Sequence, residues 1–302
     1  MSGTHIKNNE TPFVSPQILD GRVLRDRGVT SLKEAVSMSD KRPTLAIIQV
    51  GSLPESSAYI EQKRKFAEKI GAGFVHRQLP DDISEESLIR AVEEINDDSR
   101  IHGVIVQLPI PQRLNKQKVI DTIASRKDVD GLTSANKKLF EAGGAGAVVP
   151  ATARGVLSLL RGYGIEVSGK RATVIGRSAL VGAPIATLLA REGAIVTVCH
   201  KETKDIPEKS RQADILIVAI GQPRYINREY VSAGEIVVDV GINSVTGKKL
   251  DEEIPKRELV GDVDFEDVKN IVGAISPVPG GVGPMTVLSL FENLFDVAGI
   301  VI

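Results

Sequence analysis

The chain has 302 residues, of which 42% are hydrophobic and 25% are charged, and its formal net charge is −1. A chain of this length exceeds the usual size of one domain, so two domains of roughly 100–150 residues each are expected. The balanced charge and the scarcity of aromatic residues give no reason to expect a nucleic-acid partner.

Short apolar runs alternate with amphipathic helical stretches in the N-terminal half, in the rhythm of βαβ units. The pattern predicts helices at 58–71, 84–96 and 116–125 and strands at 44–50, 73–79 and 102–111. The continuous apolarity of these strands predicts a parallel sheet with both faces covered by helices.

The segment at 140–155, rich in glycine and alanine, interrupts this pattern and is interpreted as a linker. A second α/β series follows, with a helix at 182–192 and apolar strands at 171–176, 194–200, 213–221, 234–241 and 269–276. The last helix is apolar on most sides, which indicates that it packs between the domains or returns to the first.

We therefore predict an α/β protein of two domains with parallel sheets and a cleft between them. Residues 1–150 form the first domain, 151–283 a Rossmann-like domain, and the C-terminal helix at 284–302 packs back on the first domain. The single cysteine, Cys199, excludes an internal disulfide and fits a reducing compartment. No signal-peptide core opens the chain and no run approaches a membrane span, so we expect a cytoplasmic protein with no membrane partner.

The helix at 58–71 carries a lysine where its pattern predicts an apolar residue. Lys63 lies on the stripe formed by Tyr59, Phe66, Ala67 and Ile70. A lysine held on an apolar face loses solvation, which lowers its pKa toward the range useful for acid–base catalysis. The alternative is a lysine whose stem covers the core while its ammonium reaches water, and the residues alone favour this second interpretation.

Residues 171–200 are typical of a strand, a glycine turn, a helix and a second strand. Gly176 permits a tight turn, Gly182 lets the helix approach the sheet, and the helix N-terminus offers free N–H groups to a phosphate. The spacing is G-x-x-x-x-x-G instead of G-x-G-x-x-G. A dinucleotide site and an α/β turn that binds nothing are therefore equally open.

At the end of the second strand of this unit, His200 and Lys201 stand where an NAD site usually has an acidic residue. Arg177 in the glycine turn is another cation that can reach the same phosphate, and together they favour NADP. The adjacent Glu202 keeps NAD possible, and solvated charges at a strand end are the alternative to either cofactor.

Polar residues appear at two further turns. Gln107 ends an apolar strand at the carboxyl edge of the predicted sheet, where ligands bind, although a capping amide bonded to a neighbouring loop explains it equally well. Asp128 and Asp130 precede Gly131, which is ordinary turn chemistry until another observation singles out one aspartate.

The stretch at 276–286 places three prolines and three glycines ahead of the last helix. This composition stiffens the chain and exposes backbone groups, which suits a wall pressed against a flat ligand; an elaborate helix entry is the alternative. No catalytic metal is expected, because metal-ligand spacing is missing around His5, His76, His102 and His200. Neither a G-x-S-x-G elbow nor a Walker-type loop is present, which argues against serine hydrolase and P-loop functions.

Taken together, the motifs resemble the family of bifunctional methylenetetrahydrofolate dehydrogenases/methenyltetrahydrofolate cyclohydrolases, from about Gln17 to the last helix. The shared segments, in order, are VGSLPESSAYIEQK, VQLPIP, KDVDGL, GRSALVGAP, GQP, VDVGIN, GDV and PVPGGVGPMT. The resemblance implies NADP-dependent oxidation of 5,10-methylenetetrahydrofolate to the 5,10-methenyl form, and hydrolysis of that form to 10-formyltetrahydrofolate. It also implies a homodimer of the cytoplasm that serves one-carbon metabolism and purine biosynthesis.

The resemblance further implies roles for individual residues. Lys63 is similar to the catalytic lysine, Tyr59 to the aromatic residue on the folate ring, Gln107 to the partner that tunes the lysine, and Asp130, rather than Asp128, to the carboxylate that grips the pterin. The substrate-binding residues implied are Ser56, Tyr59, Val106, Leu108, Asp130, Pro279, Gly280, Gly281 and Pro284. The cofactor-binding residues implied are Gly176, Arg177, Ser178 and Ile242, and His200 and Lys201 are added to them from their place at the strand end.

The chain departs from the family pattern at two places. Ala151 and Ala153 replace a cysteine and a proline near the expected hinge, and Lys201 replaces a serine, which bears on phosphate recognition. Two other functions are considered: a two-domain dehydrogenase for a different small substrate, and a folate-binding scaffold without catalysis. Lys63 on the binding face argues against the scaffold.

Overall fold

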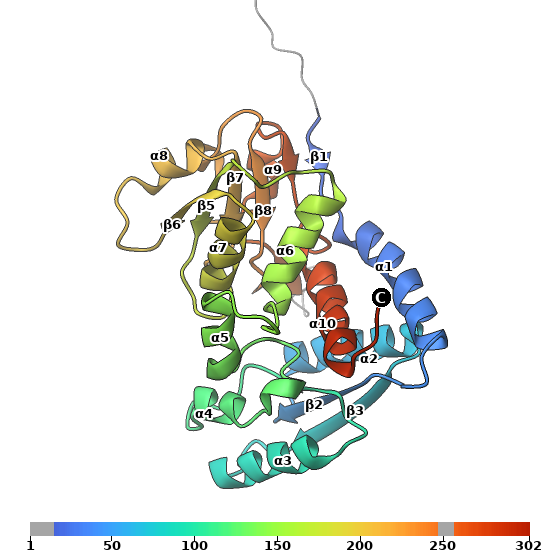
Figure 1. Cartoon of the computed structure of the whole chain (residues 1–302). Coiled ribbons are helices and arrows are strands. Elements are labelled where there is room, and N and C mark those ends of the chain that lie inside the picture. The colour runs from blue at the N-terminus through green and yellow to red at the C-terminus, as the bar shows by residue number, and fades with distance from the viewer. Residues whose placement is uncertain (1–14, 247–256) are drawn as a thin grey trace, which may run out of the picture.

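The computed structural model describes residues 15–246 and 257–302, which are organised around two parallel sheets (Figure 1). The larger sheet has six strands in the order β1-β11-β8-β7-β5-β6, and the smaller has three in the order β3-β2-β4. A short antiparallel pair is formed by β9 and β10. The α/β class with parallel sheets, predicted from the sequence, is confirmed.

The smaller sheet consists of β2 (Thr44–Val50), β3 (Gly73–Leu79) and β4 (Gly103–Val106). β2 is the central strand and is buried along almost its whole length, which explains the uninterrupted apolar run in its sequence. The helices in this part of the chain are α1 (Gly21–Ser37), α2 (Pro54–Ile70), α3 (Glu85–Asp97), α4 (Lys116–Asp121) and α5 (Ser134–Glu141).

The larger sheet consists of β1 (Gln17–Ile18), β5 (Arg171–Ile175), β6 (Ile195–Cys199), β7 (Ile215–Val218), β8 (Ile236–Asp239) and β11 (Ala274–Ile275). The antiparallel pair is β9 (Asn243–Thr246) with β10 (Arg257–Val260). The helices are α6 (Ala151–Gly162), α7 (Gly182–Arg191), α8 (Ile206–Arg211), α9 (Phe265–Val268) and α10 (Val282–Ala298).

The N-terminal residues connect the two parts of the molecule. β1 pairs with β11 at the edge of the larger sheet, and α1 then leads back toward the smaller sheet (Figure 1). The hydroxyl of Tyr163 accepts the N–H of Asp20 at 2.9 Å, which ties this crossing to the larger part. Within the predicted first domain, 1–150, one strand therefore belongs to the other sheet, and the division at residue 150 stays a prediction.

The C-terminal helix α10 lies between the two sheets, beside α6, α1 and α2 (Figure 1). Phe291 contacts Phe66 of α2 with ring centroids 5.0 Å apart, and both side chains are buried. The amide of Asn293 donates to the carbonyls of Val129 and Val149 at 2.8 and 2.9 Å. Packing on several sides explains why the helix is apolar almost all round.

The linker predicted at 140–155 is wrong at both ends, because α5 ends at Glu141 and α6 begins at Ala151. Gly155 lies inside this helix, and a Cβ atom there would stand 2.9 Å from the backbone N of Thr286 and 3.0 Å from the carbonyl carbon of Met285. The small residues therefore permit a close approach between α6 and α10, a role that composition cannot distinguish from that of a linker.

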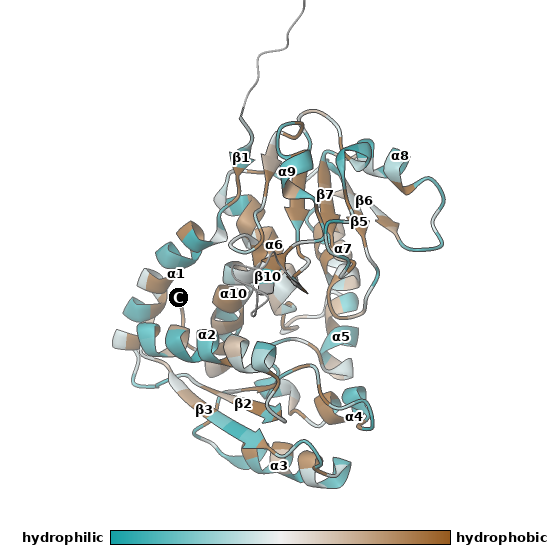
Figure 2. Cartoon of the chain, turned by 180° about the vertical axis from the view of Figure 1, so that it is seen from behind, coloured by the Kyte–Doolittle hydropathy of each residue, from teal (hydrophilic) through white to brown (hydrophobic). Residues whose placement is uncertain are grey.

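Hydrophobic residues concentrate on the strands of the larger sheet and on α10, while the outer faces of α1 and α3 are hydrophilic (Figure 2). The buried residues of α3 follow helical spacing at Leu88, Ala91, Val92 and Ile95. Among the described helices, none is both long and apolar enough to cross a membrane.

Candidate active site

A cavity of about 350 Å3, which we call the main cavity, opens between α2, the end of β4 and the loops after β8 and β11. Eight of the residues predicted for the site line it: Tyr59, Lys63, Gln107, Ile242, Pro279, Gly280, Gly281 and Pro284. Residues from both parts of the chain thus face one space beside the carboxyl ends of β4 and β8, where open α/β folds bind ligands.

Lys63 enters the cavity from α2 and meets Gln107 at the end of β4. Its Nζ donates to Oε1 of Gln107 at 2.8 Å, while Nε2 of Gln107 donates to the carbonyl of Leu108 at 2.9 Å. The second bond directs the amide oxygen toward the lysine. Burial lowers the pKa of Lys63 below its usual value, and the negative charge of Asp130 opposes this shift.

The structure distinguishes between the two aspartates of KDVDGL. Asp128 is buried, and its carboxylate accepts the N–H groups of Gly131, Leu132 and Thr133 and the hydroxyl of Thr133. Asp130 makes no side-chain hydrogen bond within the described residues, and its charge interacts with Lys63. Burial raises the pKa of Asp130 to about 6, Lys63 lowers it, and the charge of Asp128 adds to the increase.

The other predicted substrate residues differ in position. Tyr59 is half-buried in the cavity wall, and burial together with the charge of Glu55 raises its pKa. Ser56 and Val106 are buried outside the cavity lining, and Leu108 lines a neighbouring cavity. Their roles in binding stay predictions.

The glycine turn after β5 has the geometry of a dinucleotide-binding turn. Gly176 has φ of 120°, and a Cβ atom there would stand 2.1 Å from the carbonyl oxygen of Ala219. A Cβ atom at Gly182 would stand 2.1 Å from the carbonyl oxygen of Gly176. Ser178 accepts the N–H of Val181 at 3.2 Å, so its hydroxyl orders the entry to α7. The residues present therefore fit a bound dinucleotide whose phosphates lie at this helix N-terminus.

The predicted cations gather beside this turn. One guanidinium nitrogen of Arg177 lies 3.4 Å from Nε2 of His200, and the other donates to Glu202 at 3.4 Å. Lys201 is exposed next to them. Arg177 and Glu202 are also exposed, so their ion pair contributes little stability and is open to exchange with another anion.

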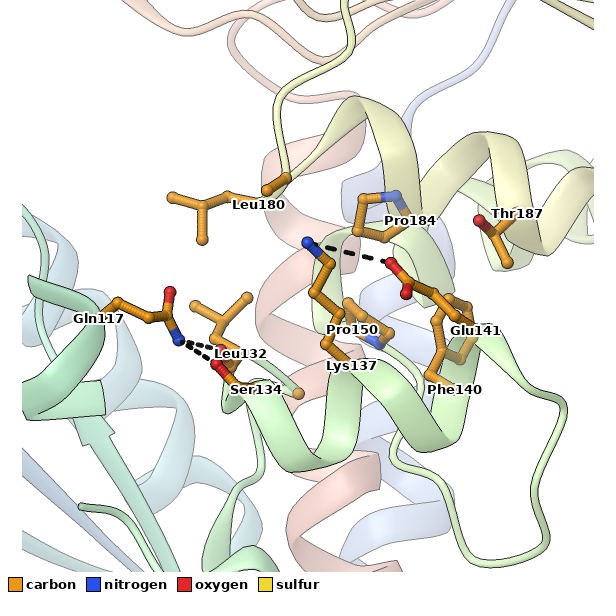
Figure 3. A pocket seen from close by; sticks show the side chains of 12 residues that line it. Gln117, Leu132, Ser134, Lys137, Phe140, Glu141, Pro150, Leu180, Pro184 and Thr187 are labelled. Carbon is orange, nitrogen blue, oxygen red and sulfur yellow. Dashed lines mark hydrogen bonds and ion pairs between the residues drawn. The ribbon is translucent and has the colours of Figure 1, made fainter. Parts of the chain in front are cut away.

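A second cavity, of about 250 Å3, lies between α5 and the N-terminal part of α7 (Figure 3). Leu180 and Pro184 face it from one side, and Lys137 and Glu141 of α5 face it from the other, forming an ion pair at 3.9 Å. Gly131, directly after Asp130, also lines it. The sequence did not predict this wall, because α5 was not recognised as a helix.

The motifs VDVGIN and GDV each contain an aspartate to which the sequence assigned no role. Asp239 ends β8 and lines the main cavity, where its carboxylate accepts the N–H groups of Gly241, Asp262 and Val263. Burial raises the pKa of Asp239 to about 7, and the three N–H groups oppose the shift. The sequence signal that could have identified Asp239 is an acidic residue at the end of an apolar strand. Gln107 was considered for its place at the same kind of sheet edge.

Across residues 15–246 and 257–302, no group of three or more His, Cys, Asp or Glu side chains has the arrangement of a metal site. His5, one of the four histidines considered, lies outside the described residues.

A glycine turn at the carboxyl edge of a six-stranded parallel sheet and a half-buried lysine beside the same cavity define a two-domain α/β enzyme with a dinucleotide site. Comparison with known families refines this class. Residues 19–130 match the catalytic domain of tetrahydrofolate dehydrogenase/cyclohydrolase, and residues 150–300 match the NAD(P)-binding domain of the same enzyme. The chain belongs to the tetrahydrofolate dehydrogenase/cyclohydrolase family.

Individual relatives agree with this assignment. The bifunctional protein FolD of Listeria innocua is 43% identical over 286 residues, covering 93% of this chain and 97% of the relative. Among solved structures, FolD from Campylobacter jejuni is 38% identical with a TM-score of 0.87, covering 94% of this chain and 99% of that one. The enzyme from Trypanosoma brucei is 36% identical with a TM-score of 0.88, covering 94% and 97%.

The predicted activities are thereby confirmed: the chain is a methylenetetrahydrofolate dehydrogenase and methenyltetrahydrofolate cyclohydrolase. Tetrahydrofolate derivatives are its substrates, and a nicotinamide dinucleotide is its cofactor. The two alternatives, a dehydrogenase for another substrate and a folate-binding scaffold, are set aside.

Proposed function

We propose that Lys63 is the proton-transferring residue of the cyclohydrolase step and that Gln107 and Asp130 set its position and charge. The observation that carries this proposal is the 2.8 Å contact between Nζ of Lys63 and Oε1 of Gln107 inside the main cavity. A snorkelling lysine directs its ammonium to water, whereas this one is directed to an amide within the cavity.

The chemistry requires one proton carrier. Water attacks the methenyl carbon, loses a proton, and the ring opens when the departing nitrogen gains a proton. An amine with a lowered pKa accepts and returns a proton near neutral pH, so Lys63 fits both parts of this step. The carboxylate of Asp130 favours the ammonium form after the proton has been accepted.

The folate is held by a wall, a ring and a carboxylate. Tyr59 packs on the ring system, the segment from Pro279 to Pro284 lies against its other side, and Asp130 accepts two donors from the amino-pyrimidine edge. Two features support this arrangement. Tyr59 and this segment line one cavity. The Asp130 carboxylate accepts no hydrogen bond from the other described side chains, although its charge interacts with Lys63.

The dinucleotide is NADP rather than NAD. When bound, NADP accepts the hydride released from the methylene carbon. Arg177 and Lys201 hold the additional phosphate, and both lie beside the glycine turn that fits the remaining phosphates. The Trypanosoma brucei relative was solved in complex with NADP and an inhibitor, which supports the same choice here.

The resemblance also supports a homodimer that acts in the cytoplasm and contributes to purine biosynthesis. Sedimentation of the purified chain tests the dimer. For the catalytic proposal, methylenetetrahydrofolate and NADP are mixed with the protein, and absorbance reports the methenyl product and the reduced cofactor. Loss of the methenyl signal over time then reports the cyclohydrolase step, and an unchanged rate of that loss in a folded Lys63→Met variant would contradict the proposal.

A further inference from the structure

We propose that Asp262 is a positioning residue for the nicotinamide cofactor, because its carboxylate joins the loops that follow β7 and β8. This inference rests on the proposed use of the larger sheet's carboxyl edge by NADP. Asp262 lies in the segment between β10 and α9 and is fully buried, with an exposed fraction of 0%.

Within the described residues, every hydrogen bond of this carboxylate is made to the loop after β7 or to Asn243, the first residue of β9, where the loop after β8 ends. Its Oδ2 accepts the N–H groups of Ile220 and Gly221 at 2.7 and 2.9 Å. Its Oδ1 accepts the N–H of Gln222 at 2.8 Å and the side-chain amide of Asn243 at 2.9 Å. Both oxygens are occupied, so Asp262 acts through the loops and not on the cofactor itself.

The two loops occupy the edge where a dinucleotide binds. β7 and β8 are neighbouring parallel strands, and ligands of open parallel sheets bind outside the carboxyl ends of the strands. The loop after β8 carries Ile242, which lines the main cavity. Asp262 therefore determines the separation of two loops that face the cofactor.

The residues on both sides of Ile242 contact the Asp262 carboxylate. Asn243 donates to it, and Gly241 packs so closely that a Cβ atom would stand 2.2 Å from the Asp262 Cγ. Only glycine fits at that position, which explains the VDVGIN motif. The backbone on either side of a predicted cofactor residue thus depends on Asp262.

Asp239 fixes the segment that carries Asp262. The Asp239 carboxylate accepts the N–H of Asp262 at 3.1 Å and the N–H of Val263 at 2.9 Å. A Cβ atom at Gly261 would stand 1.8 Å from Asp239 Oδ2, so the GDV motif also requires its glycine. The two carboxylates therefore connect the end of β8, the GDV segment and the loop after β7 in one network.

The test is Asp262→Asn, which keeps the shape but presents an amide nitrogen to N–H donors. We expect the dissociation constant for NADP, measured by calorimetric titration without substrate, to rise about tenfold or more. The KM for NADP should rise similarly. Cyclohydrolase activity on supplied methenyltetrahydrofolate should change by no more than about twofold, since that step transfers no hydride.

Two further variants keep the test decisive. Asn243→Ala removes one donor at a half-exposed position and should raise the NADP dissociation constant about two- to fivefold, even if Asp262→Asn fails to fold. Glu235→Gln is the matched control, because Glu235 is a buried carboxyl group just before the opposite end of β8. It should leave the dissociation constant unchanged.

An unchanged NADP dissociation constant in Asn243→Ala, or equal losses of both activities in a folded Asp262→Asn variant, would overturn the inference. A different result would show that the proposed preference for NADP is wrong: the unaltered protein would bind NAD more tightly than NADP. In that case, a weaker affinity of Asp262→Asn for NAD would still support the role of Asp262.

Discussion

Nζ of Lys63 lies 2.8 Å from Oε1 of Gln107, although the two residues are 44 positions apart and belong to α2 and the end of β4. Their contact joins α2, which follows β2, to the end of β4, the strand that pairs with β2 in the smaller sheet. It places an amine and an amide in the main cavity. The bond from Gln107 to the Leu108 carbonyl fixes which end of the amide faces the lysine. This geometry is the basis of the first prediction.

Lys63→Met should reduce cyclohydrolase activity on the order of a hundredfold or more, because it keeps the side-chain stem and removes the proton carrier. Dehydrogenase activity should fall less, since hydride transfer depends mainly on holding folate and nicotinamide face to face. Methenyltetrahydrofolate should accumulate. Both rates and the melting temperature are measured on the same preparation.

The matched control for that prediction is Lys65→Met, on the exposed side of the same helix, where the lysine pairs with Glu61 at 3.7 Å. It should leave both activities near their original values. Near-normal cyclohydrolase activity in a folded Lys63→Met variant would contradict the catalytic role.

Asp130→Ala should weaken folate binding while leaving NADP binding nearly intact, because this carboxylate is the one available to the amino-pyrimidine edge. Asp128→Ala should instead lower the melting temperature, since it leaves two buried N–H groups and one half-buried N–H group without their acceptor. Titrations with folate and with NADP, combined with thermal unfolding, separate the two effects. Greater damage to folate binding by Asp128→Ala would show that the wrong aspartate was chosen.

Asp130→Asn should increase the free energy of unfolding at neutral pH. Burial raises the pKa of Asp130 from 3.8 to about 6, so between these values the folded chain binds more protons than the unfolded chain and loses stability as pH rises. The variant lacks this titration. The free energy of unfolding of the variant should exceed that of the unaltered chain by an amount on the order of 1–3 kcal/mol above about pH 6, and this difference should vanish below about pH 4. Denaturant unfolding of both proteins at about pH 4 and about pH 7 measures this difference. An equal difference at the two pH values would show that the titration of Asp130 does not cause it.

Lys201→Glu should raise the KM for NADP far more than the KM for NAD, because it places a negative charge beside the additional phosphate. Glu202→Gln should act in the opposite direction by releasing Arg177 from its 3.4 Å ion pair. Since these groups are exposed, the change from Glu202→Gln should be no more than about fivefold. Steady-state kinetics with both cofactors measure the ratio of the two KM values. Equal changes in the KM for NAD and for NADP would contradict the proposed contact between these residues and the additional phosphate.

Gly155→Ala should destabilise the chain by about 1–3 kcal/mol, because the added methyl group enters the contact between α6 and the backbone of Met285 and Thr286. Ser158→Ala, on a half-exposed position of the same helix, is the control. Thermal unfolding compares the two variants. A stabilised Gly155→Ala variant would mean that α6 and α10 can separate without loss.

Several elements follow from local pattern alone. The run at 44–50 predicted β2 at the bounds observed, since a buried parallel strand needs little more than a short stretch of apolar residues. β3 also has the bounds predicted, although it is an edge strand whose residues are mostly exposed or half-buried. β1 and α6 were missed for a physical reason. A two-residue strand has no periodicity, and small residues suit both a linker and a tight helix contact.

The sequence by itself determined the α/β class, the lysine on an apolar helix face and, through its motifs, the family. Only the tertiary structure decided which aspartate makes no side-chain hydrogen bond within the described residues, which end of the Gln107 amide faces Lys63, and that Asp262 joins two loops. Hydrophobic periodicity is a local property, because neighbouring residues on one element share one environment. The hydrogen-bond partners of the Lys63 and Asp262 side chains are 19 to 44 residues away along the chain, and folding alone brings them within 3 Å.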